Sequence, residues 1–406
     1  MEKKPRNKKL IGELCLIVLL IVFVCVLLFN DRTTTPEKIW EAISTADYKY
    51  FAAAIITLIL YTVLYSLSLV VISKNLKVEV KVGDLYLIST SEFFFNGITP
   101  MAVGGQPFQV FGYKQVNVEA SKSTGIILMN FLASLASMVI VSLVSLSYYP
   151  LIVENCTIQM RVWFWVGFCI NCAGFIIFTM LGASKFFRKI IVGFFNWICR
   201  WKIMRRVKGI DKKFEQYITN AQTAFKDAWK NKLTFVLAVL SKIIANIALF
   251  SIPFFILKAL KLPVGHTKGM LDATMFFEIL CLTSFIQITS NFIPTPGAAG
   301  GMEAAFKYFF LPIVIQAGAF ATAEETATAT AGVLLWRIVT YYLLMIYSFM
   351  CYVIFSKKKH SKYPHFIGDN KKENKEQHLE DNNSLNIESN GEIIEKEKVA
   401  SVDTSE

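Results

Sequence analysis

The chain has 406 residues, of which 54% are hydrophobic, and its mean hydropathy is +0.47. A composition this apolar excludes an ordinary soluble domain and indicates a protein that crosses a membrane several times. The formal net charge is +12. Because the basic residues cluster beside apolar segments, we expect anionic lipid headgroups, and not nucleic acid, to be their partner.

The cysteine and histidine positions predict no metal centre, cofactor or disulfide framework. Most of the eight cysteines fall within apolar segments, and three of the four histidines lie in the polar segment after residue 355. Metal sites and disulfide frameworks need several such side chains at matched spacings. We therefore expect no metal and no cofactor.

The long apolar segments, taken in chain order, predict six full membrane spans. Five basic residues precede the run Leu10–Phe29, which is long enough to span and which we interpret as a retained helix, not a cleaved signal peptide. The other five spans are expected at about residues 50–72, 124–149, 162–181, 233–257 and 329–355.

Two further apolar segments, 85–98 and 271–293, run into clusters of proline and glycine. Residues 290–303 read SNFIPTPGAAGGME, and residues 96–107 read NGITPMAVGGQP, so both contain Pro-x-x-x-Gly-Gly shortly after an asparagine. Proline and glycine interrupt helices. At membrane depth, non-helical backbone survives only where protein or a watery cavity satisfies its polar groups.

Each break is therefore predicted to form a re-entrant or broken helical hairpin. Paired breaks in matching places of two halves are typical of transporters built from an inverted repeat, whose substrate site lies between the breaks. Two ordinary loops between helices are the alternative. The predicted fold class is an all-α polytopic membrane protein with six full spans and two such hairpins.

The distribution of charge predicts the orientation of the chain. With six spans and two hairpins, one side of the membrane carries 27 lysine and arginine residues and the other carries seven. The positive-inside rule places the richer side, with both termini, in the cytoplasm. The two hairpins then enter from opposite faces, and the expected location is a bacterial cell membrane.

Two segments differ from the apolar spans in composition. Residues 184–232 hold 13 basic residues among aromatics, with apolar positions every three to four residues, which predicts an amphipathic cytoplasmic segment on anionic lipid headgroups. The expected domains are therefore a lipid-handling membrane domain, 1–355, and a disordered cytoplasmic tail, 356–406, which is rich in charged and polar residues.

Ionisable residues at membrane depth are the first functional candidates, because each costs roughly 2.5–3.5 kcal/mol to insert. Glu303 follows the second break directly, where a helix N-terminus stabilises negative charge. Arg337 lies within the last apolar span, and a Glu303–Arg337 pair would neutralise both groups. Such a pair serves either packing alone or a lipid phosphate, for which the forked donors of arginine are suited.

The remaining candidates surround the two breaks. Glu92 and Asn96 are one helical turn apart and are expected to face one cavity. Glycine N–H groups at the breaks are potential anion donors, and the asparagines either cap the backbone or bind substrate. The full set of substrate-binding candidates is Glu92, Asn96, Gly104, Gly105, Gln106, Glu278, Asn291, Gly300, Gly301, Glu303 and Arg337.

The segment Pro296–Glu303, followed by Trp336-Arg337, resembles the membrane domain of the lysylphosphatidylglycerol synthase/flippase family. Asn96, Pro100 and the pair Gly104-Gly105 are similar to its first-half motif, and the likeness covers about residues 10–355. The resemblance implies a polytopic domain that handles phospholipid, in some members aminoacylated phosphatidylglycerol. Full synthases add a soluble aminoacyltransferase domain, which we do not expect the 51-residue tail to form.

The predicted function is accordingly lipid translocation, with phospholipids as partners and no catalytic residue assigned. The substrate is expected to be an aminoacylated phosphatidylglycerol or another anionic or polyprenyl lipid. The resemblance leaves two alternatives: a phosphatidylglycerol lysyltransferase and an accessory membrane subunit of a separate synthase.

Overall fold

A computed structural model of the protein describes residues 36–99, 102–146, 158–199, 210–261, 272–290, 295–298, 300–307 and 323–358. Within these ranges every regular element is a helix, as predicted. The chain divides into two compact units, residues 1–360 and 361–406, and all described elements belong to the first. The predicted span Leu10–Phe29 and almost all of the predicted tail lie outside the described residues.

Five helices of the described part are long and apolar enough to cross a membrane. They correspond to the five predicted spans that fall within these ranges, and the exact number of spans stays a prediction. They are α3 (Tyr48–Asn75), α6 (Ala120–Ser145), α8 (Ile158–Ala183), α11 (Lys232–Ala259) and the continuous rod of α15 (Ala323–Arg337), η6 (Ile338–Leu343) and α16 (Leu344–Lys357).

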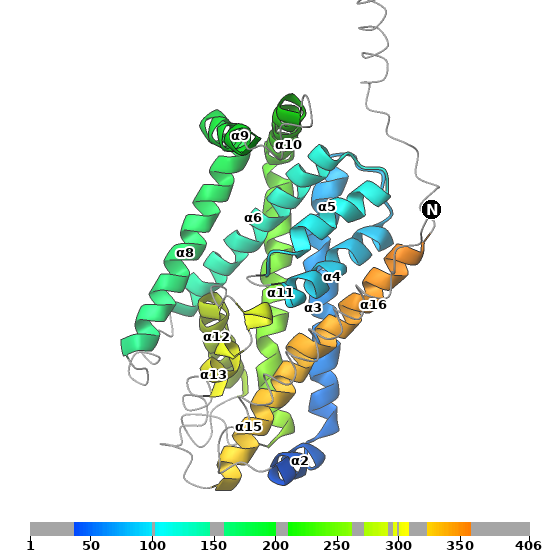
Figure 1. The fold of residues 1–406 in the computed structure, drawn as a ribbon. Coiled ribbons are helices and arrows are strands. Elements are labelled where there is room, and N and C mark those ends of the chain that lie inside the picture. Colours follow the sequence, from blue (N-terminus) through cyan, green and yellow to red (C-terminus); the bar gives the residue numbers. More distant parts are fainter. Residues whose placement is uncertain are drawn as a thin grey trace, which may run out of the picture. The chain divides into compact units, whose positions relative to one another are not determined.

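Within the described residues, α3 and α11 run antiparallel and share the most extensive packing between two helices, and we call them the central pair (Figure 1). At one end the Asp47 N–H donates to the Ala259 carbonyl over 2.8 Å. At the other end the Asn231 amide donates to the Asn75 side chain over 3.0 Å. We call these the Asp47 end and the Asn75 end, and they define the two sides of the fold.

The first break forms a helical hairpin of α4 (Val82–Ile98) and α5 (Gly105–Gln115). A Cβ added to Gly105 would lie 2.5 Å from Asn96 Oδ1, and one added to Gly112 would lie 3.1 Å from Ile88. These contacts show that α5 runs back along α4. The hairpin therefore begins and ends on the side of the Asn75 end.

The second break follows α12 (Asp272–Ser290), which runs antiparallel to α11. The Phe276 ring packs on Phe254, and Leu280, further along α12, clusters with Phe250, so α12 begins near the Asp47 end. The break continues through η4 (Pro296–Ala298) into the short α13 (Gly301–Ala305). The two hairpins thus start from opposite ends of the central pair (Figure 1).

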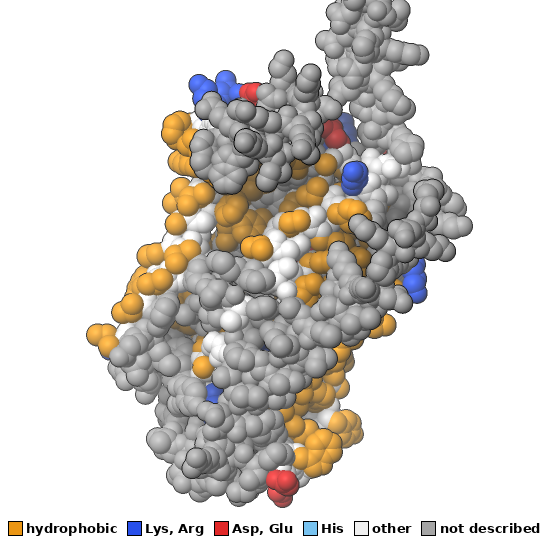
Figure 2. All heavy atoms as spheres, viewed as in Figure 1, with side chains coloured by type: hydrophobic (Ala, Val, Ile, Leu, Met, Phe, Trp, Pro, Cys, Tyr) orange, Lys and Arg blue, Asp and Glu red, His pale blue; other side chains and the backbone are white. Residues whose placement is uncertain are grey.

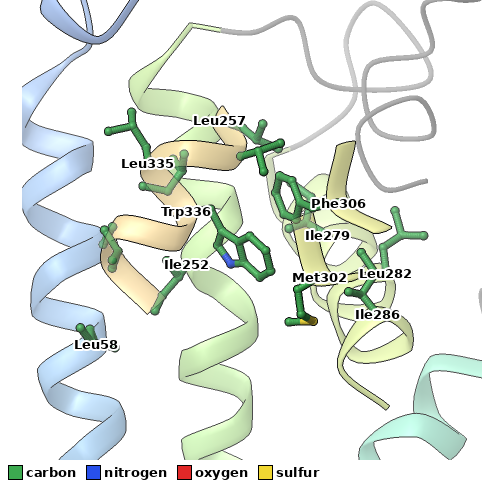
Figure 3. Packing of buried hydrophobic residues seen from close by; sticks show 14 of the residues in the cluster. Leu58, Ile252, Leu257, Ile279, Leu282, Ile286, Met302, Phe306, Leu335 and Trp336 are labelled. Carbon is green, nitrogen blue, oxygen red and sulfur yellow. The ribbon is translucent and has the colours of Figure 1, made fainter. Parts of the chain in front are cut away.

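The second hairpin packs its return arm against α12. Met302 lies beside Leu282 and Ile286, while Phe306 lies beside Ile279 (Figure 3). The later residue of the return arm thus meets the earlier residue of α12, so the two segments run antiparallel. The Trp336 ring on α15 stacks on Phe306 with centroids 4.4 Å apart. This packing joins the second break to the last span and to α11.

The predicted amphipathic segment 184–232 contains two helices, α9 (Lys185–Cys199) and α10 (Ile210–Lys230), at the Asn75 end (Figure 1). Phe186, Ile190 and Phe194 recur every four residues on α9 and are exposed. Figure 2 shows apolar side chains over much of the described part of the visible face. Such exposure fits a surface covered by lipid.

The opposite end carries α2 (Pro36–Ser44), a short helix that packs on α15. Trp40 on α2 is 71% exposed, which is typical of an aromatic side chain at a membrane interface.

Candidate functional site

A cavity of about 510 Å³ lies between the two breaks. The first break contributes Asn96, Gly97, Ala102 and Gln106 to its wall. The second break contributes Thr295, Gly297, Ala298 and Met302, and α3, α6, α8, α11, α12 and the last rod complete the wall. Both glycine-proline segments, almost 200 residues apart in the chain, therefore border one cavity.

The predicted ion pair between Glu303 and Arg337 is present. Arg337 Nε lies 2.5 Å from Glu303 Oε1, and the two side chains are 4% and 3% exposed. The other carboxylate oxygen accepts the Gly300 N–H over 2.7 Å, which caps the start of α13. Glu303 thus holds the second break and the last span together.

Arg337 also donates to the second break directly. Its Nη2 donates to the Gly297 carbonyl over 3.0 Å, and its guanidinium lies 4.7 Å from the centre of the Tyr341 ring. A guanidinium carries five N–H donors. The bonds to Glu303 and Gly297 use two of them, and Arg337 lines the cavity, so within the described residues three donors stay available for a ligand.

Tyr341 extends this network to the first break. Its hydroxyl donates to the Gly97 carbonyl over 3.0 Å, and its ring covers Gly297, where any added Cβ would overlap it. Arg337 and Tyr341 are four residues apart at the junction with the π-helix η6. Irregular turns of this kind frequently mark functional sites. A single stretch of one helix therefore contacts both breaks.

The first break has its own buried carboxylate. Glu92 is 4% exposed and accepts from Gln109 Nε2 over 2.6 Å and from Asn96 Nδ2 over 3.4 Å. Asn96 in turn accepts the Gly105 N–H over 2.9 Å. The Gly104 N–H donates to the Thr99 hydroxyl over 3.0 Å. Both glycine amides predicted as anion donors are thus bonded within their own hairpin.

Lys242 lies behind the first break. It is the eleventh residue of the 28-residue helix α11. Its side chain is 1% exposed, its ammonium makes no hydrogen bond in the described part of the chain, and Nζ lies 2.9 Å from the centre of the Tyr65 ring. Tyr65 itself lines the cavity.

The other predicted residues are placed as follows. Gln106 lines the cavity, and Gly301 begins α13. Glu278 is buried on α12 but is not among the lining residues. Asn291 lies outside the described residues.

Lys242 was not among the predicted substrate-binding residues, and neither were Tyr65, Gln109 and Tyr341. A lysine in the middle of an apolar helix is a signal that sequence reasoning could have used more strongly. Tyr341 could have been found from its position one turn after Arg337. No comparable signal marks Tyr65 or Gln109, which depend on how the helices pack.

Comparison with known proteins adds a family assignment to this geometry. The model of the family described as "Lysylphosphatidylglycerol synthase TM region" matches residues 15–348. The uncharacterized protein MG306 homolog of Mycoplasma pneumoniae is 23% identical over 272 residues, which cover 64% of this chain and 66% of the relative. The uncharacterized protein MG306 of Mycoplasma genitalium is 22% identical over 275 residues, with the same coverage.

The matched region spans just under two thirds of each of these relatives. No solved structure matches the chain. The family model covers well over half of the 406 residues and includes both breaks and Arg337. The protein therefore belongs to the lysylphosphatidylglycerol synthase transmembrane family.

Proposed function

We propose that the protein translocates phospholipid across a membrane, with the headgroup passing through the cavity between the two breaks. The observation that carries this proposal is the shared cavity itself, which both breaks line and which Arg337 borders. Interrupted helices around a polar site at the bilayer midplane are the usual construction of secondary transporters. The family assignment is consistent with a phospholipid as the substrate.

Arg337 is the residue that holds the lipid phosphate in this proposal. Guanidinium donors match phosphate oxygens in pairs, and water exclusion strengthens such contacts. Glu303 keeps the arginine oriented through its 2.5 Å contact. Asn96 and Gln106, on the opposite hairpin, supply polar groups for the rest of the headgroup.

The apolar part of the substrate would stay in the bilayer while the headgroup moves. Ile170, Gly174 and Phe178 of α8 line the cavity, and Ile170 is 43% exposed. We therefore place the path of the acyl chains along α8. The two hairpins start from opposite ends of the central pair, so rocking of the halves as an inverted repeat would expose the cavity alternately to each side.

Lipid translocation by the purified protein tests this function. The protein is reconstituted into vesicles that contain fluorescent phosphatidylglycerol, and a membrane-impermeant quencher reports how fast label reaches the outer leaflet. Losing a charge-assisted contact worth about 1.5–3 kcal/mol slows a step by about tenfold or more. We expect Arg337→Ala to translocate lipid about tenfold more slowly, or slower still. Lys74→Ala, which removes an exposed charge at the end of α3, should translocate lipid at the wild-type rate.

Equal rates for wild-type protein, Arg337→Ala and protein-free vesicles would overturn the proposal. The family name also suggests the enzyme, so the same preparation is incubated with phosphatidylglycerol and lysyl-tRNA. Formation of lysylated lipid would favour a synthase. Co-purification with a separate synthase, without translocation, would favour an accessory subunit.

A further inference from the structure

A second pair of buried ionisable groups, Lys242 and Glu92, lies beside the cavity and has no part in the headgroup contacts above. The two side chains come from different helices, α11 and α4, and Tyr65 of α3 lies between these helices. Lys242 rests on the Tyr65 ring, and that ring packs on Phe93, the residue after Glu92, with centroids 4.8 Å apart. Their exposures are 1% and 4%. Charged groups this deeply buried are costly unless a partner fixes them.

This pair differs from Glu303–Arg337 in how it is held. Arg337 and Glu303 are locked by a direct contact of 2.5 Å. The Lys242 ammonium makes no hydrogen bond in the described part of the chain and rests on the face of the Tyr65 ring. Glu92 is held by the neutral amides of Gln109 and Asn96.

The chemistry of the two cations also differs. Arginine keeps its proton under all physiological conditions, whereas a buried lysine and a buried carboxylate both exchange protons. An ammonium beside a carboxylate carries no net charge. One added proton on Glu92 gives an ammonium beside a carboxylic acid, and the site then carries one positive charge.

Two side chains connect the pair to the substrate space. Asn96 bonds to Glu92 and lines the cavity, and Tyr65 covers Lys242 and lines the cavity. In the described part of the chain, the other titratable groups against the pair are Tyr61 and Tyr65 of α3. Both are phenols, which do not titrate near neutral pH. Proton exchange at this place therefore falls on Glu92 and Lys242.

We propose that Lys242 and Glu92 form a proton-coupling site, at which one proton is taken up together with an anionic headgroup and released on the other side. The proton comes from water on one face, forms an O–H bond with a Glu92 carboxylate oxygen, and returns to water on the opposite face. The resulting positive charge balances the phosphate in the cavity. This inference rests on the proposed lipid translocation and adds its energy source.

The test is the steady-state distribution of labelled phosphatidylglycerol between the two leaflets of vesicles that carry a pH gradient. One proton per lipid converts a gradient of one pH unit into an asymmetry of up to about tenfold. We expect an asymmetry approaching that value for the wild-type protein. Glu92→Gln, which keeps the shape and one acceptor oxygen, is expected to move lipid but to leave the leaflets equal.

Lys242→Met is expected to abolish the asymmetry as well. The matched controls are Glu79→Gln and Lys232→Met, which change exposed residues and should behave like the wild type. Equal leaflets for wild-type protein that still translocates lipid would overturn the coupling and leave the proposed function standing. Full asymmetry in Glu92→Gln would overturn it too.

An infrared measurement checks the same site without relying on transport. Adding phosphatidylglycerol to detergent-solubilised protein should produce the carbonyl band of a protonated carboxylic acid. We expect that band in the wild type and in the exposed-residue control Glu79→Gln, and its loss in Glu92→Gln. A band that persists in Glu92→Gln would place the proton elsewhere and refute the proposal.

Discussion

Removing either partner of the Glu303–Arg337 pair should destabilise the protein more than removing both. The pair is almost fully buried, with side chains 3% and 4% exposed, and its atoms approach to 2.5 Å. Arg337→Met leaves the carboxylate with the Gly300 N–H as its remaining bond among those described above. Breaking a buried ion pair from one side costs about 3–5 kcal/mol, because the other charge stays buried.

Replacing both charges removes this penalty. Neutral groups of similar volume in place of a buried pair are often close to neutral in stability. The variant Glu303→Gln/Arg337→Met should therefore unfold with a free energy closer to the wild type than either single variant does. The free energies are obtained from denaturant titrations in detergent micelles, followed by tryptophan fluorescence, and are combined as a double-mutant cycle.

Additive effects of the two substitutions on the free energy of unfolding would refute this reasoning. If the two single changes each cost less than about 1 kcal/mol, or if their costs sum to that of the double variant, the pair carries no coupling. The Glu303–Arg337 contact would then not join the second break to the last span. The same variants measured for lipid movement separate this structural role from the headgroup role, because the double variant should fold yet translocate slowly.

Three further changes test individual contacts. Gly297→Ala should cost more than about 1 kcal/mol of unfolding free energy, because Gly297 has φ of +60° and an added Cβ would overlap the Tyr341 ring; wild-type stability would contradict the break geometry. Tyr341→Phe should cost about 0.5–1.5 kcal/mol through the lost bond to Gly97; no change by thermal unfolding would argue against that link. Gly105→Ala should reduce both stability and translocation, because its Cβ would lie 2.5 Å from Asn96 Oδ1; normal translocation would show that the first hairpin tolerates displacement.

The parts of the fold that follow from solvation could be predicted from sequence. Apolar segments of sufficient length predicted the five described spans. In lipid the backbone N–H and C=O groups must bond within the segment, and a helix satisfies them in this way. The Glu303–Arg337 pair followed from the cost of isolated charges at membrane depth. The breaks followed from proline and glycine, which cannot continue a helix.

The parts that depend on tertiary packing could not be predicted. Tyr341 looks like any aromatic residue of an apolar helix until the structure places its hydroxyl at the Gly97 carbonyl. Lys242 meets Tyr65 only because α3 and α11 pack side by side in one register. The glycine amides of the first break were read as ligand donors, but Thr99 and Asn96 already accept from them. Periodicity and spacing carry no information on such long-range partners.

The central claim is that lipid headgroups pass between the two breaks, and photocrosslinking tests it most directly. Wild-type protein in vesicles is irradiated with a phosphatidylglycerol that carries a photoactivatable group on its headgroup, and the modified peptides are mapped by mass spectrometry. The account predicts adducts on the residues of the two breaks that line the cavity, which are Asn96, Gly97, Ala102, Gln106, Thr295, Gly297, Ala298 and Met302. Adducts confined to exposed, lipid-facing positions such as Ile56 and Ile59 of α3 would contradict it.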